Sequence, residues 1–175
     1  SKSIENKKAY YASLGTQKGA TTNFVSIGSS AHGCLDNEYY TQNYYEQNLY
    51  RKALEEKHFP IYRGLKLSKD DKIRQQATQQ LRSYFKINFE KFKKDFKINP
   101  KEYFSKEIKY LDEMIKDGLV NVTKEGIEMT ELGRDFSQNI SNVFDKYDPP
   151  SKSYNDRLST IQKAKLAQAK LQESI

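Results

Sequence analysis

Residues 117–147, "DGLVNVTKEGIEMTELGRDFSQNISNVFDKY", decide the fold. Two short apolar runs, 119–122 (LVNV) and 127–130 (IEMT), flank a segment that ends in Gly126, and this pattern predicts a β-hairpin. Thr130 is placed to cap a closing helix. The apolar residues of that helix recur at helical spacing and are Leu132, Phe136, Ile140, Val143, Phe144 and Tyr147.

Three helical patterns precede the hairpin. Ser68, followed by Asp70 and Asp71, is suited to begin the first, because an N-cap hydroxyl and early acidic residues complement the helix dipole. The second covers about 88–96, and the third runs over 100–117 with Phe104, Ile108, Leu111 and Ile115 on one stripe. The sequence therefore predicts an α+β, mostly helical fold, with a winged-helix-like module of helices and a small β-hairpin at 67–148. Residues 149–175 are expected to form an exposed, partly helical tail.

Residues 1–66 have a different character. The run 24–27 (FVSI), ended by Gly28, predicts a buried strand that leads into a loop. A helical pattern follows over 39–57 and is stopped by Pro60. One strand has no sheet of its own, so we expect 1–66 to be the last strand and linker of a larger β-containing domain.

Composition excludes several classes of protein. The chain of 175 residues has 36% hydrophobic residues, no run of about 18 apolar residues, and a first segment (SKSIENKKAY) without the apolar region of a secretory signal. We therefore expect a soluble, cytoplasmic protein with no membrane span. Cys34 is the single cysteine, so these residues cannot build a four-cysteine zinc site or a cysteine-ligated iron–sulfur cluster.

The net charge of +7 is unevenly distributed. Residues 67–148 carry 16 basic and 15 acidic side chains, whereas 1–66 carry 9 and 6, and 149–175 carry 5 and 2. The helix before the hairpin, 100–117, has four lysines against five acidic residues, so a phosphate backbone would be repelled about as much as attracted. We expect no nucleic-acid binding, although a winged-helix DNA-binding module remains an alternative.

Several motifs resemble the C-terminal portion of the HemN-type oxygen-independent coproporphyrinogen III oxidase family, which are radical S-adenosylmethionine (SAM) enzymes. They are "YRGLKLSKDDKIRQQ" at 62–76, "DGLVNVTKEGIEMTELGRDFSQNISNVFD" at 117–145, and "GSSAHG" with the following "YYTQN" at 28–43. The resemblance extends from about Tyr11 to Ile161. Any one motif is weak, and the set together is specific.

This resemblance implies a role for each part of the chain. In the family, an N-terminal barrel-like domain binds a [4Fe–4S] cluster through a C-x3-C-x2-C motif and cleaves SAM to a radical, which starts decarboxylation of porphyrinogen propionates in heme biosynthesis. It implies that 1–66 end that domain, that 67–148 cover the substrate, and that the cluster-binding partner domain lies outside these residues. The chain alone is then expected to be non-catalytic. Backbone groups near the barrel rim would contact SAM, and the residues implied are Gly28, Ser29, Ser30, Ala31 and His32.

Two departures from the family pattern leave alternatives open. Ser13 and Leu14 precede Gly15 where these oxidases carry Phe-Gln as part of a second SAM site. The "GSSAHG" segment with His32 is closer to relatives such as the heme chaperone HemW and heme-degrading HutW-type enzymes. A heme chaperone or heme-degrading protein is therefore an alternative function.

Candidate substrate-binding residues are those that suit the propionates of a tetrapyrrole. Arg63, Arg74 and Asn139 are the candidates, and the guanidinium groups of the two arginines can bind carboxylates through two parallel hydrogen bonds. Arg134 has the same chemistry. Structural roles compete with these interpretations: Arg74 is placed to pair with Asp70 one helical turn earlier, and a lone loop histidine such as His32 is often structural. Cys34 is expected to be a small, semi-buried apolar residue.

Overall fold

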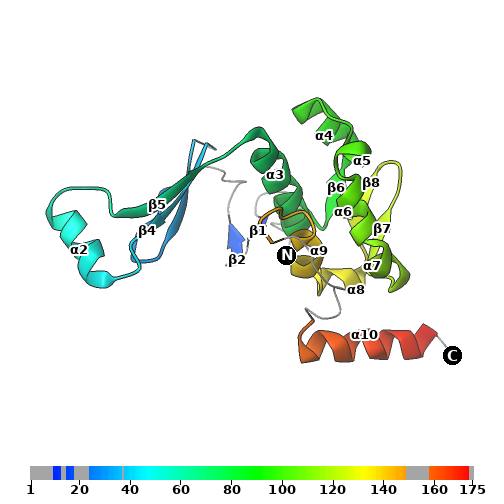
Figure 1. The fold of residues 1–175 in the computed structure, drawn as a ribbon. Coiled ribbons are helices and arrows are strands. Elements are labelled where there is room, and N and C mark those ends of the chain that lie inside the picture. The colour runs from blue at the N-terminus through cyan, green and yellow to red at the C-terminus, as the bar shows by residue number, and fades with distance from the viewer. Residues whose placement is uncertain (1–9, 13–14, 18–23, 37, 149–157, 174–175) are drawn as a thin grey trace. The chain divides into compact units, whose positions relative to one another are not determined.

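A computed structural model describes residues 10–12, 15–17, 24–36, 38–148 and 158–173 (Figure 1). The chain divides into two compact units whose boundary falls inside helix α3, between Lys72 and Ile73. We call the described residues 24–72 the sheet unit and the described residues from Ile73 onward the winged-helix unit. Near the N-terminus, β1 (Tyr10–Ala12) and β2 (Gly15–Gln17) pair as a two-stranded sheet.

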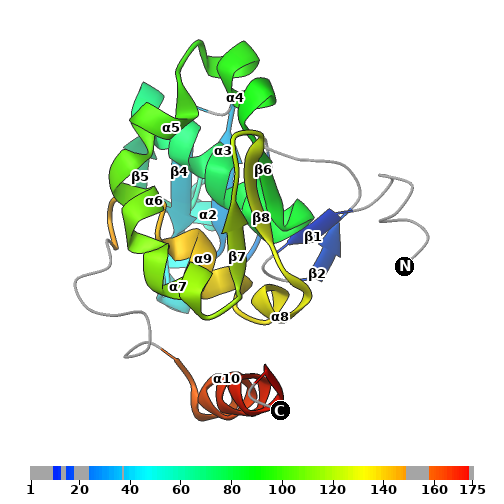
Figure 2. The same ribbon diagram turned by 90° about the vertical axis from the view of Figure 1, so that its right-hand side faces the viewer.

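In chain order, the described part of the winged-helix unit has a helix, a strand, a run of four helices, two strands and three closing helices. The elements are α3 (Lys69–Tyr84), β6 (Lys86–Asn88), α4 (Phe89–Phe96), α5 (Pro100–Tyr103), α6 (Ser105–Tyr110), α7 (Asp112–Lys116), β7 (Val120–Val122), β8 (Gly126–Met129), α8 (Glu131–Arg134), α9 (Ser137–Asn142) and α10 (Thr160–Glu173). The three strands form one antiparallel sheet in the order β6-β8-β7, with Ile127 opposite both Ile87 and Val122 (Figure 2). This is the arrangement of a winged helix, so the predicted fold class and the predicted β-hairpin are confirmed.

Helix starts follow the sequence signals. The Ser68 hydroxyl accepts from the Asp71 amide (3.2 Å), and the Asp71 carboxylate accepts from the Ser68 amide (2.8 Å), which is a reciprocal capping box at the start of α3. The Asn88 side chain caps α4 by accepting from the Lys91 amide at 2.8 Å. These caps satisfy backbone donors that would otherwise have no intrahelical partner.

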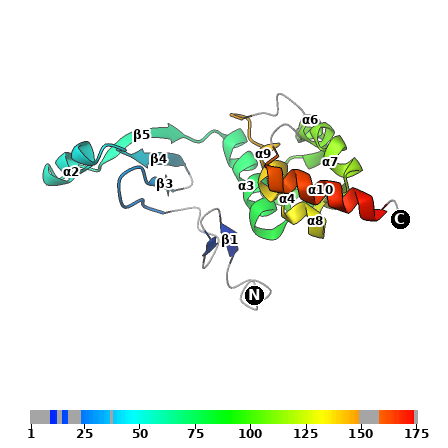
Figure 3. The ribbon, with the colours of Figure 1, turned by 90° about the horizontal axis from the view of Figure 1, so that it is seen from below.

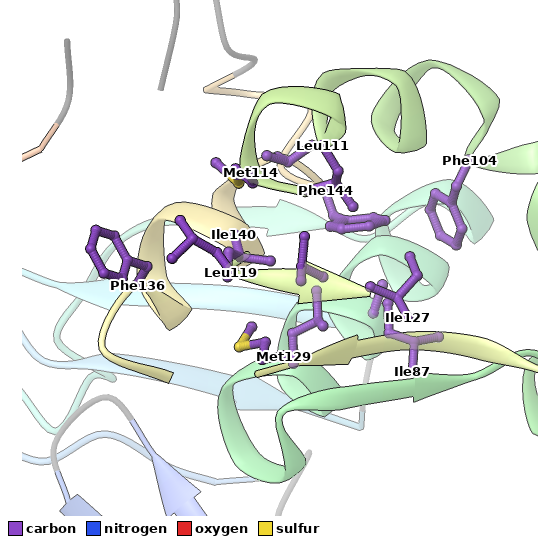
Figure 4. Packing of buried hydrophobic residues seen from close by; sticks show 14 of the residues in the cluster. Ile87, Phe104, Leu111, Met114, Leu119, Ile127, Met129, Phe136, Ile140 and Phe144 are labelled. Atoms are coloured by element: carbon purple, nitrogen blue, oxygen red, sulfur yellow. The ribbon is translucent and has the colours of Figure 1, made fainter. Parts of the chain in front are cut away.

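The hydrophobic core lies in the winged-helix unit, between the helices and the three-stranded sheet (Figure 4). Phe104, between α5 and α6, is fully buried and packs edge-on against Phe144 with ring centroids 5.2 Å apart. The ring of Phe92 in α4 also packs against the Phe104 ring, with the two centroids 6.1 Å apart. Aromatic rings from α4, from between α5 and α6, and from just after α9 thus meet in this core, and large aromatic side chains bury much apolar area.

Three expectations for this region need correction. The helix expected over 100–117 is divided into α5, α6 and α7, and Met114 is buried where Ile115 was expected on the apolar stripe. The helix expected after Thr130 is divided into α8 and α9. Strand β6 was not predicted, because three residues between two helices carry too little periodicity to be recognised.

Within the tail, most side chains of residues 158–173 are exposed, and two leucines pack into the core of the winged-helix unit. Leu158 and Leu166 are buried, and Lys165 pairs with Asp135 at 2.6 Å. Gln162 donates to the Asn139 side chain at 2.9 Å. Figure 3 shows α10 alongside α8 and α9, in agreement with these contacts. The remainder of the predicted tail, 149–157, lies outside the described residues.

The sheet unit is built from three antiparallel strands. They are β3 (His32–Leu35), β4 (Tyr39–Asn43) and β5 (Ile61–Lys66) in the order β3-β4-β5, with helix α2 (Gln47–Glu55) connecting β4 to β5 (Figure 3). The helix expected over 39–57 therefore begins only at Gln47, and part of the expected linker is a strand. The expected buried strand 24–27 was wrong: only Phe24 forms an isolated bridge, to Cys34, while Val25 is 70% and Ile27 89% exposed.

Candidate functional site

The turn before β3 holds the five residues implied as cofactor contacts. Gly28 adopts φ +105°, a backbone conformation that favours glycine, and Ser30 has φ +62°. The buried Asn43 side chain donates to the Gly28 carbonyl at 3.0 Å and to the Ser26 carbonyl at 3.3 Å. The Tyr50 hydroxyl, from α2, accepts from the Gly28 amide at 2.9 Å. The turn is therefore held from both sides by β4 and α2.

Most of the backbone groups in this turn are used to hold it. The Ser30 amide donates to the Tyr44 carbonyl at 2.9 Å, and the Ala31 carbonyl accepts from the Asn43 amide at the same distance. The side chains of Ser30 and His32 are exposed. A ligand that approached the turn would meet these side chains more readily than the backbone groups that the sequence suggested.

Gly33 lies where neighbouring segments of the chain approach too closely to leave room for a side chain. A Cβ atom at this position would lie 2.8 Å from the Thr41 hydroxyl and 3.1 Å from the Phe24 carbonyl oxygen. The missing side chain lets residues 24–26 pass against β3, and this passage begins the turn.

The strand register brings together two candidates that the sequence treated separately. His32 lies opposite Gln42 on β4, and Gln42 lies opposite Arg63 on β5. Arg63 donates through Nε to Gln42 Oε1 at 2.8 Å, and Gln42 Nε2 lies 3.4 Å from His32 Nε2. Gln42 was missed by sequence reasoning, because only the pairing of β3, β4 and β5 gives it two polar neighbours.

Arg74 and Asn139, the other two substrate candidates, lie in the winged-helix unit. Arg74 donates to Glu107 at 2.8 Å and to the Phe144 carbonyl at 3.2 Å, and the Arg74 and Glu107 side chains are 18% and 12% exposed. Asn139 accepts from Gln162 of α10. Both side chains tie helices together, and the Glu107 pairing of Arg74 was not among the sequence expectations.

Arg134, the remaining polar candidate, has a local partner, because it pairs with Glu131 at 2.9 Å. Cys34 is fully buried, so its thiol is part of the packing of the sheet unit, as expected of a small apolar residue.

Two groups of the sheet unit have shifted pKa values. The hydrogen bond that Lys72 donates to Glu38 is the main cause that lowers the pKa of this carboxyl, assisted by the positive charges of Lys72 and Lys66 and opposed by desolvation. The pKa of Tyr45 is raised, mainly by its hydrogen bond with Glu46. The Lys72–Glu38 pair joins the start of α3 to the turn between β3 and β4.

The residues present do not fit an iron–sulfur cluster. Such clusters are held by three or four cysteine thiolates, and the chain contains Cys34 alone. Among the described residues, no group of three or more His, Cys, Asp and Glu side chains is arranged to hold a metal ion. No helix in the described part of the chain is both long and apolar enough to cross a membrane.

The fold and the site together define a winged-helix module joined to a small sheet with a glycine turn. Residues 67–136 match the family model for the HemN C-terminal domain. The match confirms the resemblance of this region to the HemN C-terminal domain, which the sequence motifs indicated.

Known relatives extend the similarity beyond this domain. The chain is 34% identical over 126 residues to an oxygen-independent coproporphyrinogen III oxidase of Helicobacter pylori (strain J99) and 32% identical over 126 residues to that of Escherichia coli (strain K12). Each alignment covers 72% of this chain and 27% of the relative, so the chain spans about a quarter of the length of these relatives. A solved structure of the radical SAM enzyme coproporphyrinogen III oxidase (HemN) from E. coli matches with a TM-score of 0.74 and 28% identity, covering 83% of this chain and 33% of that one.

Proposed function

We propose that this chain is the C-terminal, substrate-covering part of an oxygen-independent coproporphyrinogen III oxidase, which decarboxylates propionate side chains in porphyrin biosynthesis. The observation that carries the proposal is the extent of the similarity: the relatives match over 126 residues, well beyond the domain at 67–136.

The sheet unit is proposed to complete a catalytic domain, with 1–66 as its end, 67–148 as the cover and 149–175 as the tail. The support is its apolar surface. Among its described residues only Cys34 and Leu67 are buried hydrophobic residues, and those left exposed are Phe24, Val25, Ile27, Tyr39, Tyr40, Tyr45, Leu49, Leu54, Phe59, Tyr62 and Leu65. An exposed apolar surface of this extent is typical of an interface. We assign it to the N-terminal radical SAM domain that the family implies.

The cofactors are proposed to belong to the joined protein. SAM would lie against the turn that holds Gly28, Ser29, Ser30, Ala31 and His32, and there the exposed side chains of Ser30 and His32 would contact it. Asn43 and Tyr50 would keep the turn in shape. The [4Fe–4S] cluster would be held entirely by the other domain, because one cysteine cannot hold it. By itself the chain is then non-catalytic.

A heme chaperone or heme-degrading function is the second candidate. The observation in its favour is His32, an exposed imidazole at the start of β3. Heme titration of the chain tests it: a Soret shift that is lost in His32→Ala would favour this function. A winged-helix DNA-binding function is disfavoured by the mixed charge of 100–117, so we propose that nucleic acid is not a partner.

The proposed function is tested by joining the chain to the cluster-binding domain of the H. pylori relative. Under anoxia, with reductant and SAM, the joined protein is expected to consume coproporphyrinogen III, while the 175-residue chain alone should form no 5′-deoxyadenosine. Formation of 5′-deoxyadenosine by the chain alone would refute the proposal. A joined protein that cleaves SAM yet leaves coproporphyrinogen III unchanged would refute it as well.

A further inference from the structure

One row of polar side chains crosses the whole sheet unit. His32, Gln42 and Arg63 come from three different strands, and each is the register partner of the next. Directly opposed residues of antiparallel strands place their side chains on the same face of the sheet. The three side chains therefore form a continuous line on one face, separate from the backbone bonds that hold the turn at Gly28.

The amide of Gln42 has a fixed orientation in this row. Arg63 can only donate, so Gln42 must present its oxygen to the guanidinium, at 2.8 Å from Nε. The amide nitrogen then lies 3.4 Å from His32 Nε2, and it can donate to that atom in the tautomer that carries its proton on Nδ1. Gln42 is thus held at both ends and in turn fixes the direction of the guanidinium.

The Arg63 guanidinium has donors that Gln42 does not use. Gln42 accepts only from Arg63 Nε, which leaves the two terminal nitrogens of Arg63. Across residues 24–36, 38–148 and 158–173, no carboxylate forms a salt bridge with Arg63, in contrast to Arg74 and Arg134, which pair with Glu107 and Glu131. The side chain is exposed at the edge strand β5, so a ligand can reach it.

Exposed aromatic rings lie next to this guanidinium. Arg63 Cζ is 6.0 Å from the centroid of the Tyr62 ring, and the Tyr45 ring meets Tyr62 edge-on at 5.8 Å. Tyr62 is 51% and Tyr45 59% exposed. A guanidinium group beside exposed aromatic rings suits a ligand that carries a carboxylate on a flat apolar ring system.

We infer that Arg63 binds a carboxylate of the ligand through its two terminal nitrogens, and that Gln42 is the positioning residue that holds the guanidinium for this contact. The inference rests on the proposed function for the identity of the ligand, a propionate-bearing tetrapyrrole. The amino-acid carboxylate of SAM has the same chemistry, and the experiment separates the two sources.

The test is a fluorescence titration of the 175-residue chain with coproporphyrin III, its tetramethyl ester and, by competition or calorimetry, SAM. Coproporphyrin III is expected to bind and the ester, which has no carboxylates, is not. Arg63→Lys keeps the charge but loses the fork, so we expect about tenfold weaker binding. The matched control is Arg51→Lys on the exposed face of α2, where binding should be unchanged.

Two substitutions of Gln42 separate positioning from a structural role. Gln42→Glu keeps the size and an acceptor for Arg63, so the sheet should fold as before, but its charge neutralises the guanidinium and repels a carboxylate. Binding should weaken about tenfold in Gln42→Glu and by a smaller factor in Gln42→Leu. A Gln42 that does not position the guanidinium would leave the affinity of Gln42→Leu unchanged, with circular dichroism confirming the fold of each variant.

The possible outcomes are distinct from those of the turnover experiment. Arg63-dependent binding of SAM, without binding of coproporphyrin III, would support the carboxylate site and assign it to SAM. Equal affinity of Arg63→Lys and wild type, equal binding of acid and ester, or no binding of either ligand would overturn the inference. Turnover by the joined protein would stand in each of those cases.

Discussion

Gly133 is the position where the winged-helix fold leaves no room for a side chain. A Cβ atom there would lie 1.8 Å from the Leu119 carbonyl oxygen and 2.8 Å from the carbonyl carbon. Both are backbone atoms, so no rotation of a side chain relieves the overlap. Gly133→Ala must therefore move α8 away from the residue that leads into β7.

The cost of this movement follows from the contacts around Thr130. Its hydroxyl caps α8 by accepting from the Gly133 amide at 3.0 Å, and its amide donates to the Leu119 carbonyl at 3.0 Å. Loss of the cap costs about 1 kcal/mol. Loss of the backbone bond costs roughly another 1 kcal/mol. Overpacking adds about 1–3 kcal/mol. The gain in helix propensity from glycine to alanine returns about 0.5–1 kcal/mol, so the free energy of unfolding should fall by about 2–4.5 kcal/mol.

Urea unfolding monitored by circular dichroism measures this change. The matched control is Gly64→Ala, where the nearest atom, the Tyr40 carbonyl oxygen, is 3.4 Å from the added Cβ, an ordinary contact. The control should change the stability by less than about 0.5 kcal/mol. A Gly133→Ala protein that is as stable as wild type would refute the reasoning that α8 is held against Leu119.

Three further predictions concern packing, charge and the tail. Phe104→Ala should lower the free energy of unfolding by about 3–5 kcal/mol in the same assay, because it leaves a cavity between the rings of Phe92 in α4 and Phe144 just after α9. A loss below about 1 kcal/mol would contradict this packing. The pKa of Glu38 is below its usual value in the folded chain, so the Lys72 pair stabilises the fold near neutral pH and its contribution is lost as the pH falls through that lowered pKa. An NMR titration should show a higher pKa of Glu38 in Lys72→Met than in wild type, and an unchanged pKa would contradict the pairing. Leu166→Ser should remove hydrogen-exchange protection from 160–173 while leaving α3 protected, and equal protection in both proteins would show that α10 does not depend on this contact.

Local signals predicted the winged helix well. The hairpin around Gly126, the cap at Thr130 and the N-cap at Ser68 each depend on residues within a few positions of one another. Gly126 also allows close approach, because a Cβ there would meet the Ile87 carbonyl oxygen at 2.0 Å. That contact involves β6, a strand too short to show its own pattern.

The sheet unit was harder to predict, because its strands are identified by partners far along the chain. Tyr39–Asn43 was included in a helical pattern, yet it pairs with β3 on one side and with β5, beyond α2, on the other. The run Tyr39, Tyr40 and Thr41 is rich in residues that favour strands, and this signal was available. The run 24–27 looked buried because it is apolar, but apolar residues are also exposed at interfaces. The role of Gln42 depends on register, which the sequence does not show.

We propose that these residues cover the substrate of a radical SAM oxidase whose cluster is held by another domain. Product analysis of the joined protein by mass spectrometry under anoxia tests this proposal. We expect SAM-dependent loss of carbon dioxide from coproporphyrinogen III propionates, and no 5′-deoxyadenosine from the chain alone. Cleavage of SAM by the chain alone, or intact propionates after SAM cleavage by the joined protein, would contradict it.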